Sequence, residues 1–120
     1  MANTVRDRVK LAQRVLAHGT PELAQARDIY AELTALLGNC QDELRAAESE
    51  YTAHLLVCLN EHGKANRAEI VSKTGPQWAR KREAEDVLTL AERMVKTLDN
   101  LIRSMAAEWK ATQHGPRTAA

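Results

Sequence analysis

The feature that most constrains this chain is an unbroken spacing of apolar residues by threes and fours. It includes Leu23, Ala26, Tyr30, Leu33, Leu37, Cys40, Leu44, Ala47, Tyr51, Leu55 and Cys58. Such spacing places every member on one face of an α-helix, whereas a strand needs strict alternation. The pair Gly38-Asn39 is a typical helix breaker, but the spacing keeps its phase across it. We therefore predict one helix over residues 21–62, about 63 Å long. A split at Gly38 is the alternative.

A second apolar stripe runs through the predicted helix of residues 77–113. It consists of Leu88, Ala91, Val95, Leu98, Ile102, Met105 and Trp109. Its steps alternate between three and four, which is the heptad pattern of coiled coils. Val87, Met94 and Leu101 widen the stripe on one side, so we expect this helix to contact more than one neighbour. The seven residues are the predicted packing seam, within one chain or between two.

Glycine and proline divide the rest of the chain. Gly19 ends a predicted helix over residues 4–17, and Thr20 with Pro21 reads as the start of the next one. After Gly63, Asn66 and Glu69 form a capping-box-like pair that predicts a short helix over residues 67–73. Residues 114–120 are expected to be a disordered tail.

These elements predict an all-α fold in one domain, residues 1–113. Two long helices with apolar seams and a short connection favour an antiparallel hairpin, to which the N-terminal helix is added. The chain has no Phe, which suits a thin seam of small and branched side chains. Each apolar stripe is wider than the surface that one neighbouring helix can cover. We therefore expect a homodimer that completes a helical bundle; a three-helix monomer is the alternative.

The sequence also predicts a cytoplasmic protein that does not enter membranes. Residues 1–10 have no apolar core of a signal peptide, and no apolar run approaches membrane-spanning length. Cys40 and Cys58 would lie about 27 Å apart on one helix, too far for an intrachain disulfide. Two unpaired thiols fit a reducing compartment.

Charge is segregated along the chain. Residues 63–82, around the predicted bend, carry six basic side chains and one acidic one, a net +5. Basic side chains neutralise phosphates and an indole can stack on a base, so this segment predicts nucleic-acid contact. The candidate residues are Lys64, Arg67, Lys73, Trp78, Arg80, Lys81 and Arg82. Alternatively, these bases solubilise the bend or pair with Glu83, Glu85 and Asp86. A helix-turn-helix over residues 67–88 is a third interpretation.

Residues 21–62 carry eight acidic and two basic side chains, a net −6. The acids are Glu22, Asp28, Glu32, Asp42, Glu43, Glu48, Glu50 and Glu61. One interpretation is that they form the solvated face of a long helix. The functional alternative is an acidic surface that binds a host or phage protein, as an assembly component or a small inhibitor does.

No pattern in the sequence indicates catalysis. His54, Cys58 and His62 share one helix face at steps of four, but one metal ion cannot reach both histidines, which would lie about 12 Å apart. The cysteines fall at seam positions, where a thiol is buried and inert. We therefore predict no enzyme activity, no metal site and no cofactor; a metal-dependent enzyme is the alternative.

From residue 47 to residue 112 the chain resembles a loose group of small helical proteins encoded by bacteriophages and prophages. The pattern is carried by Ala47, Glu48, Tyr51, Gly63, Arg80, Arg82, Ala91, Leu98 and Leu101. The resemblance implies two long helices joined by a polar bend and a role as an accessory protein, in some cases beside DNA-recombination genes. It rests on pattern rather than on a specific motif and implies no site residue.

Overall fold

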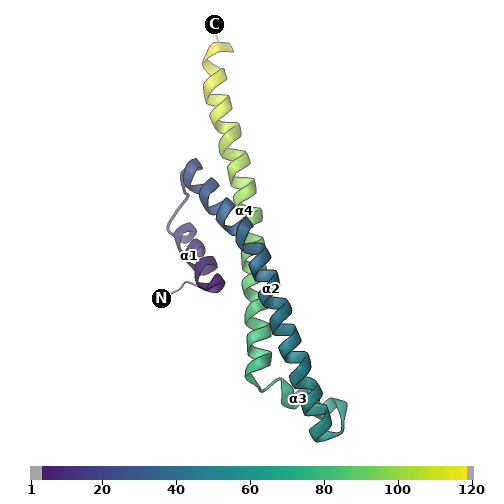
Figure 1. The fold of residues 1–120 in the computed structure, drawn as a ribbon. Coiled ribbons are helices and arrows are strands. Elements are labelled where there is room, and N and C mark those ends of the chain that lie inside the picture. Colours follow the sequence, from purple (N-terminus) through teal and green to yellow (C-terminus); the bar gives the residue numbers. More distant parts are fainter. Residues whose placement is uncertain (1–3, 119–120) are drawn as a thin grey trace.

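The computed structural model describes residues 4–118, and all regular structure within them is helical. In chain order the elements are α1 (Val5–Ala17), α2 (Leu23–His62), α3 (Ala65–Ser72) and α4 (Pro76–Thr118). The two long helices, α2 and α4, lie antiparallel as a hairpin, with α3 at the closed end and α1 beside the middle (Figure 1). The four helices confirm the predicted all-α fold. The molecule is elongated and measures 82 × 32 × 22 Å.

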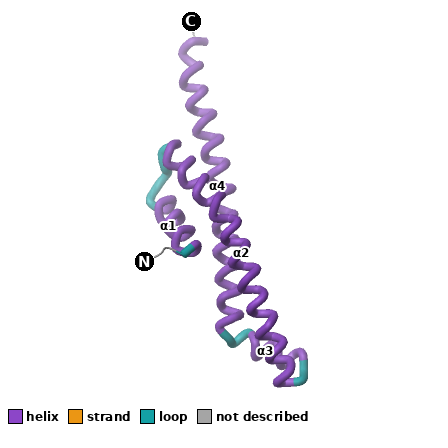
Figure 2. The backbone as a smooth tube through the Cα atoms, viewed as in Figure 1, coloured by secondary structure: helices purple, strands orange, loops and turns teal. Residues whose placement is uncertain are grey.

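The first long helix, α2, is continuous through Gly38 and Asn39 (Figure 2), the continuity that the preserved spacing predicted. Its start differs from the predicted one. The N-cap is Glu22, with extended backbone and no side-chain capping bond, rather than Thr20. Pro21 is buried in the connection instead of occupying the first helical turn. Packing of this proline therefore outweighs its preference for a helix N-terminus.

The N-terminal helix, α1, begins with a complete capping box. The Asp7 backbone N–H donates to Thr4 Oγ1 over 3.1 Å, and the Thr4 backbone N–H reaches the Asp7 carboxylate at 3.4 Å. Two positions one turn apart, Val9 and Ala12, are buried against the hairpin. Because α1 contacts both α2 and α4, it covers part of the surplus apolar face on each.

The innermost line of α4 is rotated by one position from the predicted seam. Val87, Ala91, Met94 and Leu98 are buried, whereas Leu88 and Val95 are half-buried at its flank. Ala91 and Leu98 belong to both lines. The rotation follows from packing, since α4 must present one face to α2 and an adjacent face to α1. From α2 the core receives Ala26, Leu33, Leu36 and Cys40.

The short helix and the chain end also differ from their predicted bounds. Helix α3 spans Ala65–Ser72 with Lys64 as N-cap and no side-chain capping bond, so the capping box expected of Asn66 and Glu69 is not how it begins. Helix α4 continues to Thr118, beyond the predicted end at residue 113. The tail expected over 114–120 is thus helical to Thr118; residues 119 and 120 lie outside the described part.

The two long helices are unequal, so the open end of the hairpin is uneven. The C-terminal part of α4 extends past the start of α2 and past α1 (Figure 1). Leu101 and Ile102 are the last residues of α4 that pack on the core, and Met105 is half-buried. The Trp109 side chain is 60% exposed. Over the described residues, no helix is long and apolar enough to cross a membrane.

Candidate nucleic-acid interface

The tip of the hairpin consists of α3 and the two turns that join it to the long helices. Gly63 ends α2 in the left-handed conformation, with φ of +69°, and its N–H donates to the Leu59 carbonyl. A residue with a Cβ is strained in this conformation, and glycine is not. The turn sends α3 back along α2, and Thr74 and Gly75 then lead into α4.

A buried hydrogen-bond pair fixes α3 to α2. Ser72 is fully buried, its Oγ donates to the Glu69 carbonyl over 2.8 Å, and its Oγ lies 2.9 Å from the Tyr51 hydroxyl oxygen. A serine hydroxyl has one hydrogen, and here the Glu69 carbonyl accepts it, so Tyr51 must donate to Ser72. Both buried hydroxyls are thereby satisfied, and the position of α3 is specified by polar geometry as well as by apolar packing.

The phenol ring of Tyr51 also packs against Trp78 at the start of α4. The two ring centroids are 5.1 Å apart and tilted by 53°. The ammonium groups of Lys73 and Lys81 lie 5.2 and 5.1 Å from the indole centroid, and the Arg82 guanidinium carbon lies at 6.0 Å. Lys81 is also 5.1 Å from the Tyr51 ring. Three of the predicted basic residues therefore surround the half-buried indole of Trp78. Together with Trp78 they form what we call the Trp78 cluster: Lys73, Trp78, Lys81 and Arg82.

The other three predicted residues lie elsewhere. Lys64 and Arg67 line a separate hollow of about 830 Å³ on α3, together with exposed Ile70. Arg80 turns toward α2, where its guanidinium lies 3.1 Å from the Glu50 carboxylate. Each step along a helix turns by about 100°, and Arg80 faces Glu50 on α2 while Lys81 and Arg82 reach the Trp78 ring.

Acidic side chains accompany several of the bases. Besides the Arg80–Glu50 pair, Lys73 lies 3.1 Å from Glu69 and Lys81 lies 3.8 Å from Glu85. All of these groups are at least partly solvent-exposed, so the pairs are screened and contribute little to stability. Arg67 and Arg82 have no ion-pair partner within 4 Å among the described residues. The tip therefore keeps a positive charge despite local pairing.

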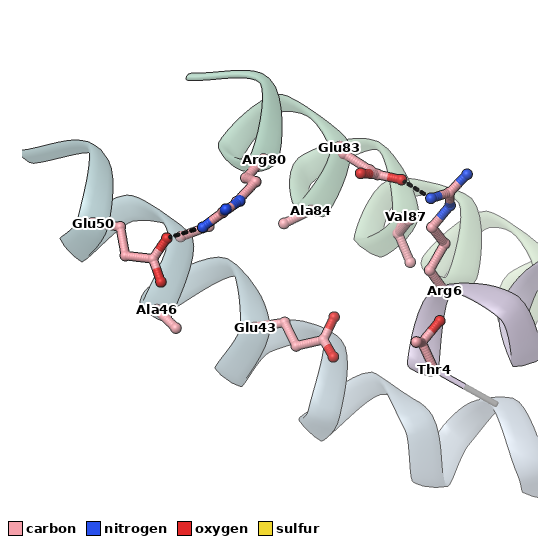
Figure 3. Close-up of a pocket in the computed structure, with 10 residues that line it drawn as sticks. Thr4, Arg6, Glu43, Ala46, Glu50, Arg80, Glu83, Ala84 and Val87 are labelled. Atoms are coloured by element: carbon pink, nitrogen blue, oxygen red, sulfur yellow. Dashed lines mark hydrogen bonds and ion pairs between the residues drawn. The ribbon is translucent and has the colours of Figure 1, made fainter. Parts of the chain in front are cut away.

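A hollow of about 350 Å³ lies between α2, α4 and the start of α1 (Figure 3). Arg6 pairs with Glu83 over 2.7 Å on one side, the Arg80–Glu50 pair lies on the other, and Figure 3 shows Glu43 between them. The lining carries both signs of charge and three alanines and one valine. Charges already paired within the chain leave little field for an anionic ligand, so the hollow is a packing junction of α1 with the hairpin.

Cys58 is buried, as its place on the apolar face of residues 21–62 predicted, and His54 is half-buried beside it. Cys58 Sγ lies 3.6 Å from His54 Nε2, and no group of three potential metal ligands is found among the described residues. Cys40 and Cys58 are both free and buried. Burial, reinforced by nearby Glu43, raises the pKa of the Cys40 thiol. This thiol is therefore protonated at neutral pH and a poor nucleophile.

Sequence reasoning missed the residues that organise this site. The apolar spacing predicts Tyr51 only as part of the buried face of residues 21–62, and it indicates no role at the bend for Ser72 or Glu50. The relevant signal is weak: a tyrosine on the buried face of a helix usually needs a partner for its hydroxyl.

Comparison of the chain with protein-family models, curated proteins and solved structures finds no match. The fold and the site therefore have to be interpreted from their own chemistry.

Proposed function

We propose that this chain is a non-catalytic accessory protein of phage or bacterial DNA metabolism that contacts nucleic acid through the hairpin tip. The observation that carries the proposal is the Trp78 cluster, in which three cationic groups lie within 6.0 Å of one indole centroid. The net +5 of residues 63–82 at one end of an elongated molecule supports it. The pattern-level resemblance to phage hairpin proteins supports the biological setting.

Within this proposal the ligand is the phosphate backbone rather than a base. The Trp78 ring already has Tyr51 against it and two ammonium groups over it, so a base would have to displace them. The aromatic rings instead hold the ammonium groups of Lys73 and Lys81 in place through cation–π attraction. A phosphate would reach these charges at a hollow of about 420 Å³, which is lined by both rings and both lysines and also by Glu69, Leu55 and Leu59. Phosphate contacts of this kind bind without reading sequence.

The test is a fluorescence-anisotropy titration of a labelled single-stranded oligonucleotide at several salt concentrations. The variant Lys73→Gln/Arg82→Gln removes two charges from the Trp78 cluster. We expect about ten-fold weaker binding at low salt and a salt slope smaller by about 1.4, since each phosphate contact on a single strand contributes about 0.7.

The matched control is Arg93→Gln/Lys96→Gln, which removes the same two charges from an exposed part of α4 away from the tip. This control should bind like the wild-type chain. Equal losses of affinity in both variants would show that binding depends only on the total charge of the chain. If the wild-type chain does not bind the oligonucleotide at low salt, nucleic acid is rejected as the ligand.

A second candidate function is a protein–protein module, and the exposed apolar side chains near the tip favour it. Leu56 is 56%, Val57 51% and Ile70 68% exposed, and the acidic side chains of α2 include exposed Glu61. Apolar groups ringed by charge are typical of protein interfaces rather than of phosphate-binding surfaces. One stoichiometric protein partner recovered by a tagged chain that ignores the oligonucleotide would select this function.

A further inference from the structure

One buried side-chain oxygen among the described residues has no hydrogen-bond partner. It is Oε1 of Gln77, in the first turn of α4. Buried polar atoms of native proteins are normally paired, and an exception indicates a strained group, a reactive group, or a bound water or ion. The neighbours of this oxygen therefore decide what it can bind.

A glycine brings this oxygen close to a histidine of α2. A Cβ added at Gly75 would lie 3.0 Å from Gln77 Oε1 and 3.1 Å from His54 Nε2. The two atoms therefore border the same small space beside the glycine, which the Cβ of any other residue would fill. An amide oxygen offers lone pairs, and so does the unprotonated nitrogen of a neutral imidazole. Both atoms are therefore possible ligands of a metal ion.

The same histidine nitrogen also faces a buried thiol, one turn further along α2. Cys58 Sγ lies 3.6 Å from His54 Nε2. In a tetrahedral zinc site, with Zn–S of about 2.3 Å and Zn–N of about 2.1 Å, the sulfur and the nitrogen lie about 3.6 Å apart. The two side chains thus have the separation of zinc ligands without any rearrangement of α2.

An open hollow of about 450 Å³ gives a cation access to this group from solvent. Both His54 and Gln77 line it. Its two charged lining residues, Glu50 and Arg80, are paired with each other over 3.1 Å. The positive charge of Arg80 is therefore offset within the hollow, and it opposes the entry of a cation only weakly.

We infer that His54, Cys58 and Gln77 form a binding site for one Zn²⁺ ion. The ligands are His54 Nε2, the Cys58 thiolate and Gln77 Oε1, and a water molecule completes the four that zinc prefers. Binding releases the thiol proton of Cys58 to solvent. No third histidine, cysteine or acidic side chain joins the group among the described residues, so the third ligand is an amide oxygen.

The site connects two elements of the tip. His54 and Cys58 belong to α2 and Gln77 to α4, so a bound ion holds the start of α4 against α2. The Trp78 cluster contains none of these three residues, and the inference does not rest on the nucleic-acid proposal. Because the amide oxygen is a weak ligand for zinc, the dissociation constant should be in the micromolar range.

Titration of the reduced full chain with Co²⁺, which replaces Zn²⁺ in such sites, tests the inference. A cysteine thiolate bound to Co²⁺ gives a charge-transfer absorption band in the near ultraviolet, so the wild-type chain alone reports whether a thiol is a ligand. We expect this band to saturate at one ion per chain and to disappear when Zn²⁺ is added. Zn²⁺ at 100 times its dissociation constant should raise the melting temperature by roughly 10 °C.

Two cysteine variants provide a matched pair. Cys58→Ser should abolish the absorption band and weaken Zn²⁺ binding at least about 100-fold. The control is Cys40→Ser, because Cys40 is equally buried on the same helix but has Leu36 in the place of a histidine four residues earlier. This control should bind Zn²⁺ like the wild-type chain. Far-ultraviolet circular dichroism checks that both variants keep their helices.

The role of the amide oxygen has its own test. Gln77→Leu should weaken Zn²⁺ binding about ten-fold, a change of one ligand in an otherwise intact site. Without zinc the same variant should melt no lower than the wild-type chain, because it removes a buried oxygen that has no partner. A wild-type chain without the absorption band, or equal Zn²⁺ binding by Cys58→Ser and the wild-type chain, would overturn the inference. Unchanged binding by Gln77→Leu would overturn the assignment of the third ligand.

Discussion

The two tryptophans of this protein lie near opposite ends of the same helix, and their surroundings differ in kind. Trp78 is half-buried, packs on Tyr51 and has basic groups around it from Lys73, which follows α3, and from α4 itself. Trp109 is 60% exposed on a segment that extends beyond the other helices. The tip is organised by the chain's own contacts, whereas the Trp109 side chain lies mostly in solvent.

The largest expected effect on stability comes from removing one aromatic ring near each end of the rod. Tyr51 is 8% exposed, and Tyr51→Ala should lower the free energy of unfolding by about 3 kcal/mol, since it leaves a cavity and removes the partner of Ser72. Trp109→Ala should change it by no more than about 0.5 kcal/mol, as for other surface positions. Urea unfolding at concentrations where the chain is monomeric measures both values. Similar losses at the two ends would contradict the comparison.

Replacing either of two glycines by alanine should change the stability of the chain, in opposite directions. Gly63 shapes the tip with a positive φ, so Gly63→Ala should destabilise the chain by about 1 kcal/mol. Gly38 lies within α2, and a Cβ there meets nothing within 4 Å. Gly38→Ala should therefore stabilise the chain by about 0.5–1 kcal/mol through helix propensity. Thermal unfolding followed by circular dichroism distinguishes the two. A stabilising Gly63→Ala would mean that the turn is not needed in this conformation.

The smallest expected effect on stability comes from removing a single hydroxyl group. Tyr51→Phe keeps the ring against Trp78 but leaves the Ser72 Oγ without its donor, at a cost of about 1 kcal/mol. A double-mutant cycle with Ser72→Ala isolates the coupling between the two side chains. A coupling indistinguishable from zero would show that apolar packing alone positions α3.

The long helices could be predicted because their spacing is a property of the chain itself. The steps of three and four along α2 persist through Gly38, and the structure keeps the helix unbroken there. The exact face of α4 could not be predicted, because spacing defines a stripe but not which neighbours cover it. The buried line passes through Val87 and Met94 rather than Leu88 and Val95, since α1 and α2 share the helix between them.

The candidate site was only partly predictable, because nearness in sequence is not nearness on a helix. Lys81 and Arg82 reach the Trp78 ring, but Arg80 points to Glu50 on the other long helix. Lys73 reaches the ring only because Gly63 turns α3 back along α2. The hydrogen bond between Tyr51 and Ser72 depends on the same turn. The apolar spacing does not predict such a reversal of the backbone.

The contact between Tyr51 and Ser72 has a kinetic consequence as well. These residues are 21 positions apart, whereas core partners such as Leu33 and Leu98, which belong to one cluster, are much further apart along the chain. Closing a short loop loses less chain entropy than closing a long one, and short-range contacts accelerate folding. We therefore expect the tip to nucleate the hairpin, the long helices to pair progressively from there, and α1, which must contact both of them, to dock last.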